Sequence, residues 1–259
     1  MDPNVNAWLE LLFRWIHAVA GIAWIGHLYF FNFVNAQVAK TYDADSKKKV
    51  VPELMPRALY WFRWGAAWTW VSGILLAGLI YYMAPNLLPP DSTMSVAAGT
   101  GLSLFLIVIV FFIYDAIWKA MAANEQAGVI VSSILIAALT WGMSRFFAPR
   151  AVFIHLGMLF GTIMAMNVWM RIWPAQKKII AAIKAGTAPD AVAVSLAGLR
   201  SKQNTYMSVP LVLTMVSNHY PTVYGAPNSW VILLVLVAVG WGMVKWLYGK
   251  SASPAPSKY

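Results

Sequence analysis

Residues 96–121 read VAAGTGLSLFLIVIVFFIYDAIWKAM, and no charged residue appears in this stretch before Asp115. A bilayer core is about 30 Å thick, so an α-helix crosses it with about 20 predominantly apolar residues. Several other stretches of the 259-residue chain approach or exceed that length. Only 11% of all residues are Asp, Glu, Lys or Arg, whereas about 25% are charged in ordinary soluble domains. The sequence therefore predicts an all-α fold, a polytopic transmembrane helical bundle.

We expect about seven spans in one transmembrane helical domain, residues 1–250, followed by a disordered Ser/Pro/Ala-rich tail, residues 251–259. The sixth span is the least regular, because it is short and contains Pro210. It is a kinked span, a re-entrant segment, or a full-length span that extends back through 191–199. Residues 174–202 read as a cytoplasmic amphipathic helix that is broken near Gly186. The expected spans are 7–38, 56–83, 96–121, 125–147, 149–173, 203–216 and 228–248.

The basic residues predict the orientation of these spans. Of the 19 Lys and Arg residues, all but Arg14, Arg145 and Arg150 fall on one side of a seven-span bundle. Cytoplasmic loops carry an excess of Lys and Arg, so we expect the N-terminus outside and the C-terminus in the cytoplasm. The net charge of +10 therefore reflects the orientation of the chain in the membrane lipid. It does not indicate a nucleic-acid partner.

The chain has no cysteine and four histidines, His17, His27, His155 and His219. Without cysteine it cannot form thiolate zinc sites, iron–sulfur clusters or a covalently attached c-type haem. An ionisable side chain inside a membrane is a candidate functional residue, because hydrocarbon solvates it poorly. The predicted topology brings three of the four close to the outer face, and it places His27 about 15 Å deeper. A hydrogen bond to a neighbouring backbone carbonyl is an equally good explanation of His27.

Histidines from facing helices are the usual axial ligands of a membrane haem b. We therefore predict a haem b bound by His17 and His155, with Arg14 able to donate to a propionate. Gly157 and Gly161 follow His155 at helical spacing, and they serve either the approach of a macrocycle or close helix packing. Other polar residues are explained without a cofactor. Asp115 and Lys119 are four residues apart and are expected to form an ion pair, and Asn167 is expected to form an interhelical hydrogen bond.

Three blocks of the sequence carry a resemblance to a known family. They are RWIHAVAGIAWIG at 14–26, HLGMLFGTIMAMNVWMRIWPAQKK at 155–178 and NTYMSVPLVLTMVSNHYP at 204–221. These blocks resemble the membrane-bound bacterial urate oxidases, also called urate hydroxylases. His27 departs from the family pattern, in which a small hydroxyl residue is expected. The family positions that this chain matches are Arg14, His17, Trp24, His155, Asn167, Gln176, Asn204, Tyr206, Asn218 and His219.

The resemblance implies a multi-pass protein of the bacterial inner (cytoplasmic) membrane that acts in purine catabolism. The implied reaction is oxidation of urate, a small purine, to 5-hydroxyisourate. We expect Asn218 and His219 to be the catalytic residues, which contact the substrate or tune the redox centre. Full-length family members carry a C-terminal cytochrome c domain. This chain has no CxxCH motif, so we expect electrons to pass through the haem to a separate cytochrome c or another membrane acceptor.

Two alternatives to an oxidoreductase remain open at this point. A haem-bearing electron-transfer or anchor subunit of a larger membrane complex would bind the same cofactor without turning over a substrate. A transporter would use the interrupted sixth segment, because broken helices often line substrate sites. The small number of intramembrane carboxylates argues against ion coupling in such a transporter.

Overall fold

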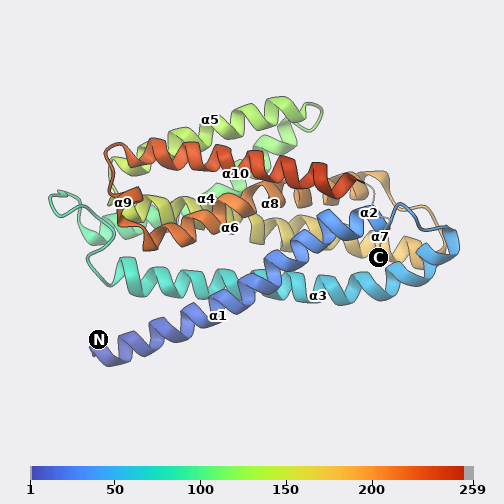
Figure 1. Ribbon diagram of the computed structural model, residues 1–259, viewed down its shortest axis with the longest axis horizontal. Helices are drawn as coiled ribbons and strands as arrows, with labels where there is room; N and C mark the ends of the chain where they lie inside the picture. Colours follow the sequence, from blue (N-terminus) through green and yellow to red (C-terminus); the bar gives the residue numbers. More distant parts are fainter. Residues whose placement is uncertain (1, 254–259) are drawn as a thin grey trace. The chain divides into compact units, whose positions relative to one another are not determined.

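The computed structural model describes residues 2–253, and within them every regular element is a helix (Figure 1). Six helical segments are long and apolar enough to cross a membrane, which confirms the predicted polytopic helical membrane protein. They are Pro3–Val38, Ala44–Tyr82, Val96–Ala120, Glu125–Ser144, Pro149–Ala185 and Ser229–Ala252. The orientation of these segments in a bilayer stays a prediction.

Several segments consist of consecutive helical elements of different type. Three π-helical stretches, η1, η2 and η3, continue α-helices without a break. In chain order the elements are α1 (Pro3–Tyr29), η1 (Phe30–Asn35), α2 (Ala36–Val38), α3 (Ala44–Ala77), η2 (Gly78–Tyr82), α4 (Val96–Ala120), α5 (Glu125–Ser144), α6 (Pro149–Asn167), η3 (Val168–Ile172), α7 (Trp173–Ala185), α8 (Ala191–Val216), η4 (Ser217–His219), α9 (Pro221–Tyr224) and α10 (Ser229–Ala252).

Side-chain caps account for the helix starts that the sequence predicts well. The Ser95 hydroxyl accepts a hydrogen bond from the backbone N–H of Ala98 (3.2 Å) at the start of α4. The Asn124 side chain accepts from Ala127 (3.0 Å) in the same way at the start of α5. Such caps satisfy N–H groups that have no partner inside the helix. At the other end of a helix, Gly186 adopts φ 74° and terminates α7, which confirms the predicted break.

The second span begins earlier than predicted. We expected it to start at residue 56, but α3 begins at Ala44 and contains Pro52 and Pro56 in its interior. The carboxylate of Asp43 accepts a hydrogen bond from the backbone N–H of Ser46 (2.7 Å) and so caps the helix. This bond, followed by one from the Ser46 side chain, lowers the pKa of Asp43 below its ordinary value. The cap defines the start of α3 although two prolines follow it.

The prediction that the sixth span is short and interrupted, at 203–216, is wrong. α8 is one continuous helix of 26 residues, Ala191–Val216, and Pro210 lies inside it without ending it. The backward extension is therefore the correct alternative, and the broken helix that favoured a transporter is not present. α8 is long enough to span a bilayer, but it is not among the six segments that are also apolar enough. α10 ends at Ala252, so residues 251 and 252 are helical although the predicted tail includes them, and residues 254–259 of that tail lie outside the described residues.

The chain divides into two compact units, which we describe separately. Unit 1 contains residues 2–13, Gly73–Ile163 and Pro210–Val239. Unit 2 contains Arg14–Ser72, Met164–Val209 and residues 240–253. The basic residues are divided very unequally, since unit 1 contains only Lys119, Arg145 and Arg150.

Candidate functional site

A buried histidine forms the centre of a hydrogen-bonded chain in unit 1. His155 lies on α6 and is 1% exposed. Its Nδ1 lies 2.7 Å from the carbonyl oxygen of Ala151, and its Nε2 lies 2.7 Å from Oγ of Ser103 on α4. The Ser103 hydroxyl is also 2.7 Å from the hydroxyl of Tyr82 on η2. A carbonyl can only accept, so Nδ1 carries the proton. In a neutral imidazole Nε2 then accepts, and the chain donates from Tyr82 to Ser103 to His155.

A second set of contacts joins this chain to the end of α8. The ring of Tyr81 stands edge-on to the His155 imidazole, with centroids 5.9 Å apart. The Tyr81 hydroxyl donates to Oδ1 of Asn218 (3.2 Å), and the same oxygen accepts from Nε of Arg150 (2.9 Å). We call these six residues the His155 network: Tyr81, Tyr82, Ser103, Arg150, His155 and Asn218.

The structure brings together some of the predicted site residues and adds others. His155 and Asn218 belong to one network, and His219 follows Asn218 on η4 with an exposed imidazole. Sequence reasoning missed Ser103 and Arg150, together with the two tyrosines. A serine in an apolar helix and an arginine beside a helix start have common local explanations, and their partners here are distant in sequence.

The environment of His155 does not match an open axial haem ligand. The Nδ1 contact to a backbone carbonyl is the usual support of a ligating histidine. However, Nε2, the nitrogen that would face iron, is bonded to Ser103, which is fully buried. The space beside Gly157 is filled by α8, because a Cβ atom at Gly157 would collide with the Thr214 hydroxyl. A haem at His155 would require the Ser103 hydroxyl to leave Nε2.

His17 lies in unit 2 and has a more open imidazole. Its Nδ1 is 3.2 Å from Oγ of Ser72, and that hydroxyl donates to the carbonyl of Trp68 (2.6 Å). Ser72 therefore accepts from Nδ1–H, which leaves a lone pair on Nε2. The carbonyl of Thr69, which accepts from the same Ser72 hydroxyl (3.1 Å), is the other polar group at this ring, and no side chain within residues 2–253 bonds to Nε2. The donor chemistry fits an axial ligand at His17, and the exposed Arg14 lies one turn before it.

Other predictions for polar residues are confirmed. Nδ1 of His27 lies 2.7 Å from the Ala23 carbonyl, one turn back on its own helix. Lys119 forms an ion pair with Asp115 at 2.8 Å. Among the described residues, no group of three or more His, Asp or Glu side chains is placed to hold a metal ion.

Unit 2 contains a second buried polar cluster, on α8 and its neighbours. Nδ2 of Asn167 donates to Oδ1 of Asn204 (2.9 Å), which confirms the predicted interhelical hydrogen bond. Nδ2 of Asn204 donates in turn to the carbonyl of Met164 (3.0 Å). Asn32 on η1 donates to the Ser201 hydroxyl (2.8 Å) and accepts from Tyr248 (3.0 Å). Each of these bonds offsets part of the cost of burying an amide.

The π-helical segments adjoin both polar clusters. η2 carries Tyr81 and Tyr82 of the His155 network, η1 carries Asn32, and η3 begins directly after Asn167. A π-helical turn inserts an extra residue and frequently occurs at a functional site. It also changes the direction of the following side chains. On η2 the adjacent residues Tyr81 and Tyr82 bond to different partners, Asn218 and Ser103.

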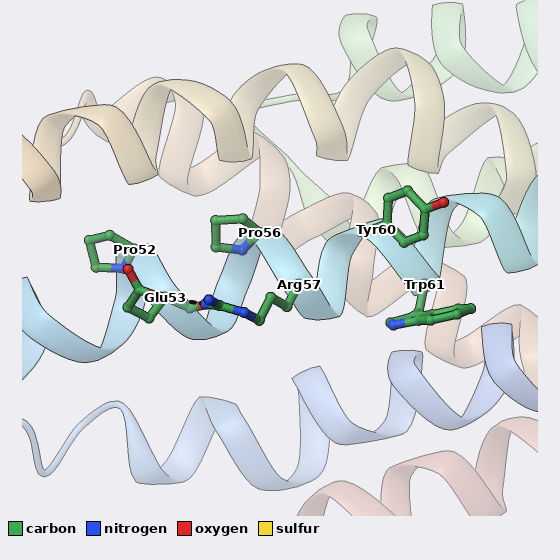
Figure 2. A pocket seen from close by; sticks show the side chains of 6 residues that line it. All are labelled: Pro52, Glu53, Pro56, Arg57, Tyr60 and Trp61. Carbon is green, nitrogen blue, oxygen red and sulfur yellow. Dashed lines mark hydrogen bonds and ion pairs between the residues drawn. The ribbon is translucent and has the colours of Figure 1, made fainter.

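A surface hollow in unit 2 is not a substrate site. Figure 2 shows that its six lining side chains, Pro52, Glu53, Pro56, Arg57, Tyr60 and Trp61, all project from α3. Glu53 and Arg57 form an exposed ion pair across one helical turn. A hollow formed by one helix cannot surround a ligand, so we place the candidate site at the His155 network.

The fold and the network define a polytopic helical membrane protein with a buried polar centre around a histidine. The family model described as urate oxidase N-terminal matches residues 3–50 and 41–256. The chain therefore belongs to the urate oxidase N-terminal family, as its resemblance implied. Comparisons with curated proteins and with solved structures found no match.

Proposed function

We propose that this chain is a membrane oxidoreductase that oxidises urate to 5-hydroxyisourate in the bacterial cytoplasmic membrane. The observation that carries the proposal is the family match, which includes every member of the His155 network. The balanced half-reaction is urate plus water giving 5-hydroxyisourate, two electrons and two protons. Two molecules of a separate one-electron acceptor, such as cytochrome c, take the electrons.

The chain's own residues contribute binding and proton transfer to this reaction. His219 has an exposed imidazole beside Asn218, so it is the candidate base that takes a proton from urate or from the attacking water. The row from Tyr82 through Ser103 to His155 holds three groups that can exchange protons along hydrogen bonds. Tyr82, at the far end of this row from the buried imidazole, is a half-buried residue. None of these residue roles depends on the predicted haem. Whether the chain binds haem is tested by its absorption spectrum.

Urate-dependent reduction of cytochrome c tests the proposal. The purified chain in liposomes is mixed with urate and oxidised cytochrome c, and urate loss and cytochrome reduction are followed together. We expect two cytochromes reduced per urate lost, and a reduction of at least 100-fold in rate for His219→Ala, the size typical of losing a general base. His27→Ala is the matched control, because the hydrogen bond of His27 within residues 2–253 is to the Ala23 carbonyl of its own helix.

The result that contradicts the proposal is an absence of urate loss with correctly folded wild-type protein. The alternative of a non-catalytic electron-transfer or anchor subunit predicts that result. If His219→Ala oxidises urate at the wild-type rate, the proposed reaction stands but His219 is not its base.

A further inference from the structure

We propose that Arg150 binds the substrate as an anion, through the edge of its guanidinium group that faces away from Asn218. This inference rests on the proposed function, and it identifies the charge state of the ligand and the group that recognises it. Nε of Arg150 donates to Oδ1 of Asn218 at 2.9 Å. No other hydrogen bond or ion pair of this guanidinium is formed within residues 2–253.

Arg150 is held in place by a neutral partner. Oδ1 of Asn218 accepts from both Arg150 and the Tyr81 hydroxyl, so the orientation of the amide is fixed by its two donors. An amide oxygen orients a guanidinium without cancelling its charge. The positive charge of Arg150 therefore remains available to an incoming ligand.

The position of Arg150 is unfavourable for helix stability. It lies in the first turn of α6, which begins at Pro149. The N-terminal end of a helix carries partial positive charge, so a cation there is normally destabilising. Arg145 offers a contrast, since it is exposed and lies over the ring of Trp141 at 5.7 Å. Arg145 has the contacts of an interfacial arginine, whereas Arg150 is half-buried and points into a polar network.

The chemistry of the open edge fits a planar anion. A guanidinium carries five N–H groups in a fixed plane, and the Asn218 contact uses only the one on Nε. The terminal nitrogens can donate two parallel hydrogen bonds to adjacent acceptors, as they do to carboxylates. Urate is a monoanion at neutral pH, and it presents adjacent oxygen and nitrogen acceptors in one plane. Hypoxanthine is a purine of similar shape that is neutral at the same pH.

Equilibrium dialysis of the full chain in detergent, with labelled urate and labelled hypoxanthine, tests this assignment. The variants are Arg150→Gln, Asn218→Asp and the control Arg145→Gln, which removes the same charge from the same inter-helix region. Asn218→Asp keeps the shape of the amide and adds a carboxylate beside the guanidinium. We expect the first two variants to weaken urate binding about tenfold or more, the effect of losing one charge-assisted hydrogen bond. We expect Arg145→Gln to bind urate like wild type, and the first two variants to weaken hypoxanthine binding less than they weaken urate binding.

The other outcomes separate this assignment from the proposed function. Equal weakening in Arg145→Gln would show a general surface-charge effect and overturn the assignment. If wild type oxidises urate and Arg150→Gln and Asn218→Asp bind it normally, the assignment fails and the proposed function stands. If urate binds through Arg150 but is never oxidised, the assignment stands and the proposed function fails. A wild-type protein that neither binds nor oxidises urate overturns both.

Discussion

Nε2 of His155 lies 2.7 Å from the hydroxyl oxygen of Ser103, and both side chains are almost completely buried. The opposite nitrogen of the ring is bonded to the carbonyl of Ala151, so the imidazole is bonded at both ends by protein groups. A histidine in this state can exchange a proton with Ser103. It cannot bind iron until the serine is displaced.

The two predicted haem ligands should behave differently in a reduced-minus-oxidised absorption spectrum. His17 keeps an unbonded Nε2, whereas Nε2 of His155 is bonded to Ser103. We expect His155→Ala to leave the spectrum of the detergent-purified chain unchanged, and His17→Ala to abolish any b-type signal. Loss of a b-type signal in both variants would instead support the original pairing of His17 with His155.

Removing the Ser103 hydroxyl should destabilise unit 1. Ser103→Ala leaves the Tyr82 hydroxyl and Nε2 of His155 without this partner, and a buried polar group that loses its partner costs about 1–3 kcal/mol. We expect a lower thermal midpoint by circular dichroism. Ser133→Ala is the control, because that exposed hydroxyl bonds only to a carbonyl of its own helix. Equal midpoints for the two variants would mean that the Ser103 bonds contribute nothing measurable.

The two buried asparagines of unit 2 should be energetically coupled. Asn167 and Asn204 bond side chain to side chain at 2.9 Å. Interhelical hydrogen bonds in membrane proteins contribute about 0.6 kcal/mol on average, with a maximum of about 1.7 kcal/mol. In a double-mutant cycle of Asn167→Ala and Asn204→Ala, we expect a coupling free energy in that range, measured by denaturant unfolding in detergent. Strictly additive effects would contradict it.

The number of spans has a direct consequence for the location of the C-terminus. Six spans place both termini on the same side of the membrane, and a seventh, α8, places them on opposite sides. From the positions of Lys and Arg we expect the N-terminus outside and the C-terminus in the cytoplasm. A C-terminal green fluorescent protein should therefore fluoresce, and a C-terminal alkaline phosphatase should be inactive. An inactive fluorescent protein with an active phosphatase would place the C-terminus outside. That result would contradict a seven-span topology with the N-terminus outside.

The features of the fold that sequence reasoning found correctly depend on local signals. Caps at Ser95 and Asn124 sit beside long apolar runs, and the ion pair of Asp115 with Lys119 spans a single helical turn. The start of α3 was missed because Pro56 reads as the first residue of a helix, which leaves Pro52 in the preceding loop. A proline inside a helix removes one hydrogen bond and crowds the carbonyl four residues earlier. The helix nevertheless begins at the cap of Asp43, upstream of both prolines.

The candidate site was only half predictable for a different reason. His155 and Asn218 are conspicuous polar residues in apolar surroundings. Ser103 is not, because serine is common in membrane helices and its partner is 52 positions away. Which hydroxyl meets which imidazole depends on helix packing and on the π-helical turn that orients Tyr81 and Tyr82. Neither is a local property of the sequence.

Gly157 should be intolerant of even a methyl group. A Cβ atom at this position would collide with the hydroxyl of Thr214, which is itself bonded to the carbonyl of Leu211 (2.7 Å). Overpacking of a buried contact costs about 1–3 kcal/mol, so Gly157→Ala should lower the thermal midpoint.

Gly142→Ala is the control on α5, where the added methyl group meets open space. It should be neutral or stabilise the helix by up to about 1 kcal/mol, because alanine has the higher helix propensity. Because the collision is with a side-chain hydroxyl, Gly157→Ala combined with Thr214→Ala should recover part of the lost stability. If the single variant is as stable as wild type, α6 and α8 are not packed this closely in unit 1, and the glycine would again be available for the approach of a flat cofactor.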